Sequence, residues 1–236
     1  MLILAHRGAC RAAPENTVAA FREAAAQGAD GVELDVHRSA DGELVVHLDA
    51  EVPGIGVLGE HPAADIRAAL PSVPTLAEAL DACEGMLVNV EVKNLPGDAD
   101  YDPDDRVAAA VVGLLHARGG RDDVLVSSFN LASIDRVREL DGGLPTAFLT
   151  LVGFDPLDAV AVVADRGHAA LHPDVRSLVG PVAGATAERA HAAGVAVNAW
   201  TVNLPEEVRR LAAAGVDAVI TDVPDLARAA LAGSDR

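Results

Sequence analysis

Three short charged segments carry residue types suited to metal and phosphate chemistry, and each lies at the end of an apolar stretch. They are His-Arg-Gly at residues 6–8, Glu-Leu-Asp at 33–35 and Glu-Val-Lys at 91–93. Because side chains alternate along a strand, Glu33 and Asp35 face the same way, and so do Glu91 and Lys93. Carboxylates buried together need a cation to neutralise them. One such segment alone is typical of a solvated acidic pair, but three on consecutive strands favour a hard divalent cation, Mg²⁺ or Ca²⁺.

Arg7 and Lys93 supply the positive charges that a phosphate group needs. The arginine offers a planar fork for two oxygens, and Lys93, the only lysine of the chain, offers a compact charge. The formal net charge of −18 means that a site for an anion must create its own positive potential. The same charge argues against nucleic acid or anionic lipid as a partner. A structural ion pair with Glu91 or Glu33 is the alternative role for Lys93.

Length and composition indicate one globular domain spanning residues 1–236. Half of the residues are hydrophobic but only 3% are aromatic, so Ala, Val, Leu and Ile must fill the core. No apolar run approaches the ~18 residues that cross a bilayer. The first strand begins at residue 2, so we expect no signal peptide, no membrane span and a cytoplasmic protein. Cys10 and Cys83 have no metal-binding spacing and are expected to be reduced thiols.

An apolar strand followed by an alanine-rich helix recurs along the chain. Strands are predicted at residues 2–8, 31–39, 86–94, 124–130, 145–151, 169–175, 195–202 and 218–222. Helices are predicted at residues 17–27, 75–82, 104–118, 131–140, 155–165, 183–193, 205–214 and 224–231. Eight such units predict an α/β fold, a (β/α)8 TIM barrel, with the charged segments on its first three strands. The alternative is an open doubly wound sheet, but no glycine-rich nucleotide-binding motif supports it.

A small insertion is predicted after the second strand. An extended piece at residues 44–49 follows the Asp41-Gly42 turn, and residues 51–74 break the strand–helix alternation with several prolines and glycines. Residues 95–103 form a second irregular segment after the third strand. Because barrel enzymes carry their active sites at the strand ends, both segments are candidate substrate loops. Surface insertions without a function are the equal alternative.

The order of the motifs resembles that of the glycerophosphodiester phosphodiesterase family over essentially the whole chain. Any one motif is weak, but the ordered set is specific: His6-Arg7-Gly8, Pro14-Glu15-Asn16-Thr17, Glu33-Leu34-Asp35-Val36, Asp41-Gly42, Glu91-Val92-Lys93, Ser128-Phe129, Trp200-Thr201-Val202-Asn203 and Thr221-Asp222-Val223-Pro224. The resemblance implies a TIM barrel that hydrolyses glycerophosphodiesters to glycerol 3-phosphate and an alcohol.

The resemblance also implies which residues bind the metal and the phosphate group. A divalent ion, Mg²⁺ or Ca²⁺, is expected to be held by Glu33, Asp35 and Glu91. Arg7 and Lys93 are expected to bind the phosphate of a small-molecule glycerophosphodiester.

Three further residues complete the expected site. The resemblance implies that Trp200, the only tryptophan, lies against the glycerol part of the substrate, and a packing role is the alternative. Glu15 lies in the loop after the first strand and is expected to line the substrate site. His6 is expected to transfer a proton as general base or general acid. Whether water or the glycerol 2-hydroxyl attacks the phosphorus stays open.

The chain departs from the family at the second of two histidines that transfer protons. The family has it in a His-Asp pair, which by counting from Asp41-Gly42 falls at residue 48, but this chain has Leu48, with His47 one residue earlier. A leucine cannot transfer a proton, and this catalysis typically contributes about 10²–10⁴-fold in rate. Alternation places His47 on the opposite face of the strand, unless a bulge turns it inward.

Three hypotheses follow from this departure. In the first, His47 takes the missing role through a local change of register. In the second, the enzyme works with His6 and a metal-bound water, and it is slow or uses a different leaving group. In the third, the protein is a catalytically impaired family member that binds a metal and a phosphate ligand. Among the other histidines, His37 is expected at the surface, and His172 either lines the barrel mouth or packs in the interior.

Overall fold

Eight parallel strands close into a barrel in the computed structural model, which describes residues 1–233. β1 pairs with both β2 and β11, so the sheet is closed and an open doubly wound sheet is excluded. The (β/α)8 barrel predicted from the sequence is therefore confirmed. The barrel strands are β1 (Leu2–His6), β2 (Gly31–Arg38), β6 (Leu87–Val92), β7 (Asp123–Ser128), β8 (Thr146–Thr150), β9 (Ala170–Pro173), β10 (Ala196–Ala199) and β11 (Ala218–Thr221).

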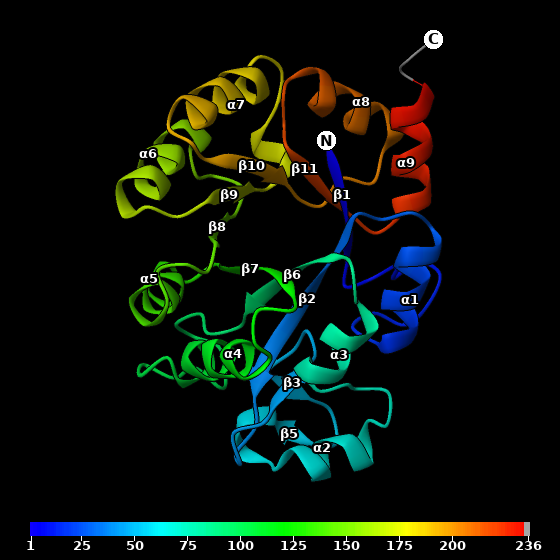
Figure 1. Cartoon of the computed structure of the whole chain (residues 1–236), viewed down its shortest axis with the longest axis vertical. Helices are drawn as coiled ribbons and strands as arrows, with labels where there is room; N and C mark the ends of the chain where they lie inside the picture. The colour runs from blue at the N-terminus through cyan, green and yellow to red at the C-terminus, as the bar shows by residue number, and fades with distance from the viewer. Residues whose placement is uncertain (234–236) are drawn as a thin grey trace.

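A helix follows each barrel strand, and together the helices form a ring around the sheet (Figure 1). Local signals explain where several of them begin. The Thr17 side chain caps α1, and Thr75 forms a capping box with Glu78 at α3. Prolines occupy the first turns of α6, α8 and α9, where no backbone donor is needed. These helices are α1 (Val18–Ala26), α3 (Leu76–Ala82), α4 (Arg106–Ala117), α5 (Leu131–Leu140), α6 (Pro156–Arg166), α7 (Val182–Ala192), α8 (Pro205–Ala213) and α9 (Pro224–Ala232).

The insertion after β2 is more regular than its composition suggested. β3 (Leu44–Val46) pairs antiparallel with β2, and β4 (Glu51–Val52) forms a hairpin with β5 (Gly56–Val57). The 3₁₀ turn η1 (Leu58–Glu60) then leads to α2 (Ala63–Ala69), a short helix that the sequence pattern did not predict. The buried side chains of Val45, Leu58 and Ile66 belong to a small apolar cluster of this insertion. Residues 95–103 contain neither helix nor strand, as expected.

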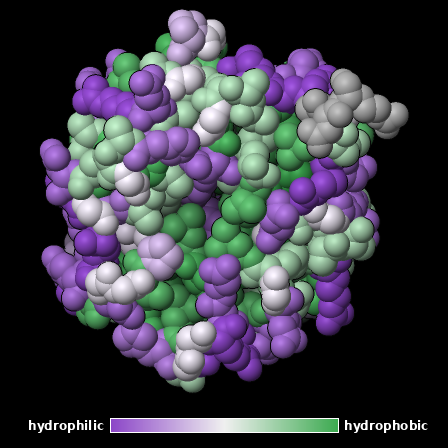
Figure 2. Space-filling model, turned by 45° about the horizontal axis from the view of Figure 1, so that its top comes forward, coloured by the Kyte–Doolittle hydropathy of each residue, from purple (hydrophilic) through white to green (hydrophobic). Residues whose placement is uncertain are grey.

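The barrel interior contains both apolar and polar side chains. Small and aliphatic side chains fill part of it, among them Leu4, Leu125 and Ala147. Buried polar side chains lie among them, including Asn198 and Asn89, which is in register with Leu125. On the outside, Figure 2 shows one face of the molecule, where hydrophilic residues cover the outer parts and hydrophobic residues gather in a hollow near the centre. No helix within residues 1–233 is long and apolar enough to cross a membrane.

Gly8 fixes the close approach of the loop after β1 to helix α1. Its φ is +78°, and a Cβ atom at this position would lie 2.6 Å from the backbone carbon of Ala20. Replacement by alanine therefore combines a left-handed backbone with a clash that only a shift of backbone can relieve.

We expect Gly8→Ala to lower the free energy of unfolding by about 3 kcal/mol, measured by denaturant unfolding, since left-handed strain costs about 1–2 kcal/mol and overpacking about 1–3 kcal/mol. Gly85→Ala is the matched control, because Gly85 has a φ of +81° and open space around its Cβ position. Gly85→Ala is expected to lose only the free energy of left-handed backbone strain, about 1–2 kcal/mol. Equal losses in the two variants would contradict the role given to the close approach.

Candidate active site

The three charged segments meet at the carboxyl ends of β1, β2 and β6. The strand register places His6 beside Glu33 and Asp35 beside Glu91. A small cavity of about 60 Å³ lies between them, with further walls from β7, β8, β10 and β11. Its lining residues are His6, Arg7, Glu33, Asp35, Glu91, Lys93, Phe129, Leu149, Trp200 and Ile220.

Three buried carboxylates form the floor of this cavity. Glu33, Asp35 and Glu91 are each less than 10% exposed, and one oxygen of each lies within 4.8 Å of the others. Burial, together with the neighbouring carboxylates, raises the pKa of Glu33 well above its usual value and also raises the pKa of Glu91. Within the described chain, Glu33 Oε1 has no hydrogen-bond partner. A buried, unpaired oxygen beside two other carboxylates fits a hard divalent cation.

Two basic side chains partly neutralise the carboxylates. Lys93 Nζ lies 2.9 Å from Glu91 Oε1 and 3.4 Å from Asp35 Oδ1, so the ion pair considered from the sequence is present. Burial alone lowers the pKa of Lys93, but Glu91 and Asp35 outweigh it and the net pKa is raised. Arg7 Nε lies 3.2 Å from Asp35 Oδ2 without the alignment of a hydrogen bond. The Arg7 side chain also donates to Glu15 Oε2 at 3.0 Å, which places Glu15 at the edge of the site.

His6 forms a dyad with an aspartate from the other end of the chain. Its Nδ1 lies 2.7 Å from Asp222 Oδ1, and Asn203 Nδ2 donates to the second oxygen of Asp222 at 2.7 Å. Although burial opposes ionisation, the hydrogen bond from His6 lowers the pKa of Asp222 to about 2. Because this carboxylate is ionised, Nδ1 of His6 donates to it, and in the neutral form of the ring Nε2 then carries no proton.

The role of Asp222 was missed in the sequence analysis, where this residue was only part of a motif. A sequence signal for this contact existed, because closure of a barrel brings the end of the last strand beside the end of the first.

Trp200 also lines the small cavity. Its ring meets Phe129 edge to face at 5.4 Å between centroids, and its Nε1 donates to the carbonyl of His172 at 2.9 Å.

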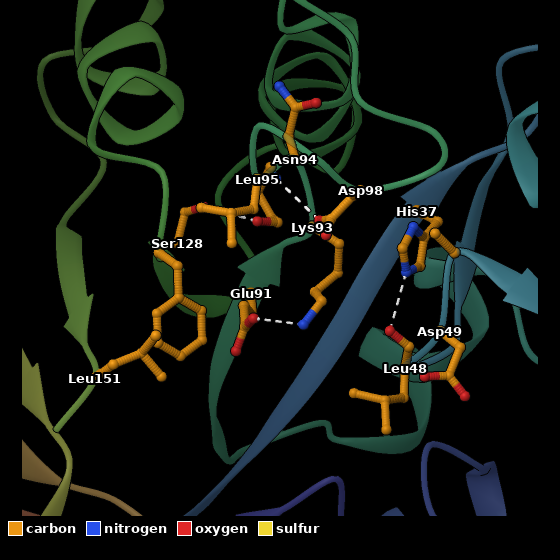
Figure 3. A pocket seen from close by; sticks show the side chains of 13 residues that line it. His37, Leu48, Asp49, Glu91, Lys93, Asn94, Leu95, Asp98, Ser128 and Leu151 are labelled. Carbon is orange, nitrogen blue, oxygen red and sulfur yellow. Dashed lines mark hydrogen bonds and ion pairs between the residues drawn. The ribbon is translucent and has the colours of Figure 1, made fainter.

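The structure does not bring His47 to the cavity. The side chain is half-buried, and its Nδ1 accepts from the backbone N–H of Asp49 at 3.1 Å. Within residues 1–233, His47 lines neither the small cavity nor the larger one beside it. The larger cavity, of about 310 Å³, is lined instead by the side chain of Leu48, and it shares Glu91, Lys93 and Phe129 with the small cavity (Figure 3).

His37 is buried, and the expectation that it lies at the surface is wrong. Only 1% of the residue is exposed, because Asp100 from the segment after β6 covers it. Its Nδ1 lies 2.6 Å from Asp100 Oδ2, and its Nε2 lies 3.2 Å from the carbonyl oxygen of Leu48, the contact drawn in Figure 3. His37 thus connects residues 95–103 to the end of β3, on two sides of the larger cavity.

The other predicted features divide between the cavities and the interior. Leu95 and Asp98 line the larger cavity, which supports residues 95–103 as a substrate loop, whereas residues 51–74 line neither cavity.

His172 is fully buried, and this burial lowers its pKa to about 3. Its neutral ring accepts from Asn198 Nδ2 at 2.9 Å, so His172 packs in the interior.

Comparison with known proteins identifies relatives that match this chain over almost its whole length. The model of the Glycerophosphoryl diester phosphodiesterase family matches residues 6–226. A glycerophosphodiester phosphodiesterase of Caldanaerobacter subterraneus subsp. tengcongensis is 30% identical over 241 residues, which cover 95% of this chain and 95% of that protein. One from Bacillus altitudinis is 29% identical over 251 residues, covering 95% and 96%.

Solved structures agree in fold. A phosphodiesterase of Oleispira antarctica, in complex with the product sn-glycerol-3-phosphate, superposes with a TM-score of 0.84 at 26% identity, covering 98% of this chain and 97% of that one. A glycerophosphodiester phosphodiesterase of Agrobacterium tumefaciens gives a TM-score of 0.74 at 27% identity, covering 97% and 99%.

The crowded carboxylates predict that the metal-free protein gains stability when Glu33 loses its charge. The folded state raises the pKa of Glu33 above its unfolded value, so ionisation destabilises the fold. This penalty decreases once the pH falls below the folded pKa and is gone below the unfolded pKa. In EDTA, Glu33→Gln should raise the unfolding temperature by a few degrees at about pH 8, since 1 kcal/mol corresponds to about 2–4 °C. The difference should shrink towards about pH 5. Glu139→Gln, at an exposed position, is the control. A Glu33→Gln protein that is less stable at every pH would contradict this account.

Proposed function

The chain belongs to the glycerophosphoryl diester phosphodiesterase family, and from this premise we propose that it hydrolyses glycerophosphodiesters to glycerol 3-phosphate and an alcohol. The observation that carries the proposal is the meeting of three buried carboxylates, two basic side chains and the His6–Asp222 dyad around one cavity. The neighbour from Oleispira antarctica, whose structure contains sn-glycerol-3-phosphate, supports the choice of substrate.

The proposed cofactor is a divalent cation, Mg²⁺ or Ca²⁺, held by Glu33, Asp35 and Glu91. The family is generally dependent on divalent metals. The donor set fits, because all three ligands are carboxylates and one buried Glu33 oxygen lacks a partner among the described residues. When bound, such an ion neutralises charge that develops on the phosphate oxygens.

Arg7 and Lys93 are proposed to bind the phosphate group. In the metal-free chain both point at carboxylates, with Lys93 on Glu91 and Arg7 near Asp35. A cation that takes over the neutralisation of these carboxylates leaves the guanidinium and the ammonium group available for phosphate oxygens. Glu15 holds the other end of the Arg7 fork at 3.0 Å and so orients it.

The proton transfer is assigned to His6. With Nδ1 donating to Asp222, the ring is held in one tautomer and Nε2 can accept a proton from the attacking hydroxyl or return one to the leaving alcohol. Trp200 and Phe129 form an aromatic wall beside the same cavity and are proposed to pack against the glycerol carbons.

A second proton-transfer group is proposed at His47, and this role requires residues 47–49 to rearrange. As it stands, the His47 side chain is bonded to the Asp49 backbone, and Leu48 lines the larger cavity. The alternative function, binding of metal and phosphate without turnover, gains no support from the comparisons. In a turnover experiment, this alternative function predicts that no product forms.

Metal-dependent turnover is the first test. Purified protein with Mg²⁺ should convert glycerophosphocholine to glycerol 3-phosphate, and phosphorus NMR measures this conversion. EDTA should stop the reaction, and added Mg²⁺ should restore it. Glu91→Gln should lose at least about 10²-fold in kcat, because the cation and its charge neutralisation are lost. The exposed-site variant Glu139→Gln should match wild type. Undiminished turnover in EDTA would rule out metal dependence. If the protein turns over no glycerophosphodiester, the hypothesis that remains is a protein that binds metal and phosphate without catalysis.

Histidine variants test the proton transfer. His6→Gln should lose about 10²–10⁴-fold in kcat, with His116→Gln, at an exposed site, as the control. If His47 also transfers protons, His47→Gln falls by a comparable factor and Leu48→His gains nothing. Near wild-type rates for His47→Gln, with a gain for Leu48→His, would remove His47 from the mechanism.

A further inference from the structure

A second group of potential metal ligands lies beside the carboxylate cluster, and its chemistry is different. A ring nitrogen of His6, Cys10 Sγ and a carboxylate oxygen of Asp222 all lie within 4.8 Å of one another. They come from the end of β1, the loop that follows it and the residue after β11. All three residues are only partly buried, so an ion can reach them from solvent.

We propose that His6, Cys10 and Asp222 form a binding site for a thiol-seeking divalent cation, with Zn²⁺ as the fitting ion, and that its occupancy inhibits the enzyme. The inhibition rests on the proposed function of His6, whereas the metal site itself does not. Zinc sites of this kind use three protein ligands drawn from imidazole, thiolate and carboxylate groups and keep a fourth position open.

The geometry requires only a small adjustment. His6 Nδ1 and Asp222 Oδ1 are already 2.7 Å apart, and Cys10 Sγ lies within 4.8 Å of a ligand atom of each. Zinc–ligand bonds of about 2.0–2.3 Å require the ligand atoms to lie within about 4 Å of one another. Because all three atoms already lie within 4.8 Å of one another, no pair needs to close by more than about 1 Å. Cys10 lies in a turn outside any helix or strand, where such a shift costs little free energy. Arg11, 3.7 Å from the Asp222 carboxylate, is 71% exposed and can turn to solvent.

The two clusters select different cations. Glu33, Asp35 and Glu91 offer oxygen alone, which suits Mg²⁺ and Ca²⁺, whereas sulfur and imidazole nitrogen favour Zn²⁺. An ion at Cys10 is therefore expected to resist competition by Mg²⁺.

Binding at this site changes the protons of the ligands and thereby blocks His6. A thiol binds Zn²⁺ as the thiolate, so Zn²⁺ replaces the proton of the Cys10 thiol, which passes to solvent. Zn²⁺ binding to His6 Nδ1 also moves the single proton of the neutral ring from Nδ1 to Nε2, so the imidazole itself releases no proton. Nε2 can no longer accept a proton, and the ring is removed from the acid–base cycle.

The chain offers a matched pair of variants, because it has only two cysteines and Cys83 is 2% exposed in the core. Co²⁺ is the spectroscopic probe, since a cobalt–thiolate bond absorbs in the near ultraviolet and cobalt bound to carboxylates alone does not. Wild type and Cys83→Ala should develop this band with one equivalent of Co²⁺ in the presence of excess Mg²⁺. Cys10→Ala should not develop it, and Zn²⁺ should abolish it in wild type. Thermal unfolding without metal checks that each variant is folded.

Inhibition is measured in parallel with Mg²⁺ present. The Zn²⁺ concentration for half-inhibition should rise by about 10-fold or more in Cys10→Ala and stay unchanged in Cys83→Ala. The absence of a thiolate band in wild type, or a band that survives in Cys10→Ala, would overturn the site. A band that depends on Cys10 while Zn²⁺ inhibits both variants equally would overturn the inhibitory role and place the inhibition at the carboxylates. If the protein turns over no diester, the cobalt band still decides whether the site exists.

Discussion

Repulsion among three buried carboxylates is the constraint on which the rest of the site depends. Glu33, Asp35 and Glu91 lie at the mouth of a barrel in a protein that carries a net charge of −18. Arg7 and the single lysine lie against these carboxylates. A divalent ion at the carboxylates would do two things at once, since it would pair the acidic oxygens and release the basic groups for an anion. We propose that phosphate recognition in so acidic a molecule depends on this exchange.

Barrel closure supplies the second part of the site. His6 and Asp222 are 216 residues apart in sequence and are brought to 2.7 Å because β1 and β11 pair side by side. Asn203, in the segment after the neighbouring β10, donates to the same aspartate. The proposed proton-transfer group is thus oriented by the closing of the sheet, while the proposed metal ligands come from the adjacent β2 and β6.

Much of this arrangement could be predicted from the sequence, and the failures have physical causes. The eight strands, the helices behind them and the positions of Glu33, Asp35 and Glu91 follow from periodicity, because side-chain alternation fixes which residues share a face. His37 was misjudged because its burial depends on Asp100, which belongs to an irregular segment whose path no local pattern encodes. Helix α2 was missed because it has seven residues and lies between proline- and glycine-containing stretches. At His47 and Leu48, alternation gave the observed result, because Leu48 lines the larger cavity and His47 lines neither of the two cavities.

The coupling between cation and anion is the central claim, and calorimetric titration with glycerol 3-phosphate measures it most directly. The account predicts that the protein binds glycerol 3-phosphate at least about tenfold more tightly with saturating Mg²⁺ or Ca²⁺ than in EDTA, and that Glu91→Gln loses most of this difference. Equal affinity with and without the divalent ion would contradict it.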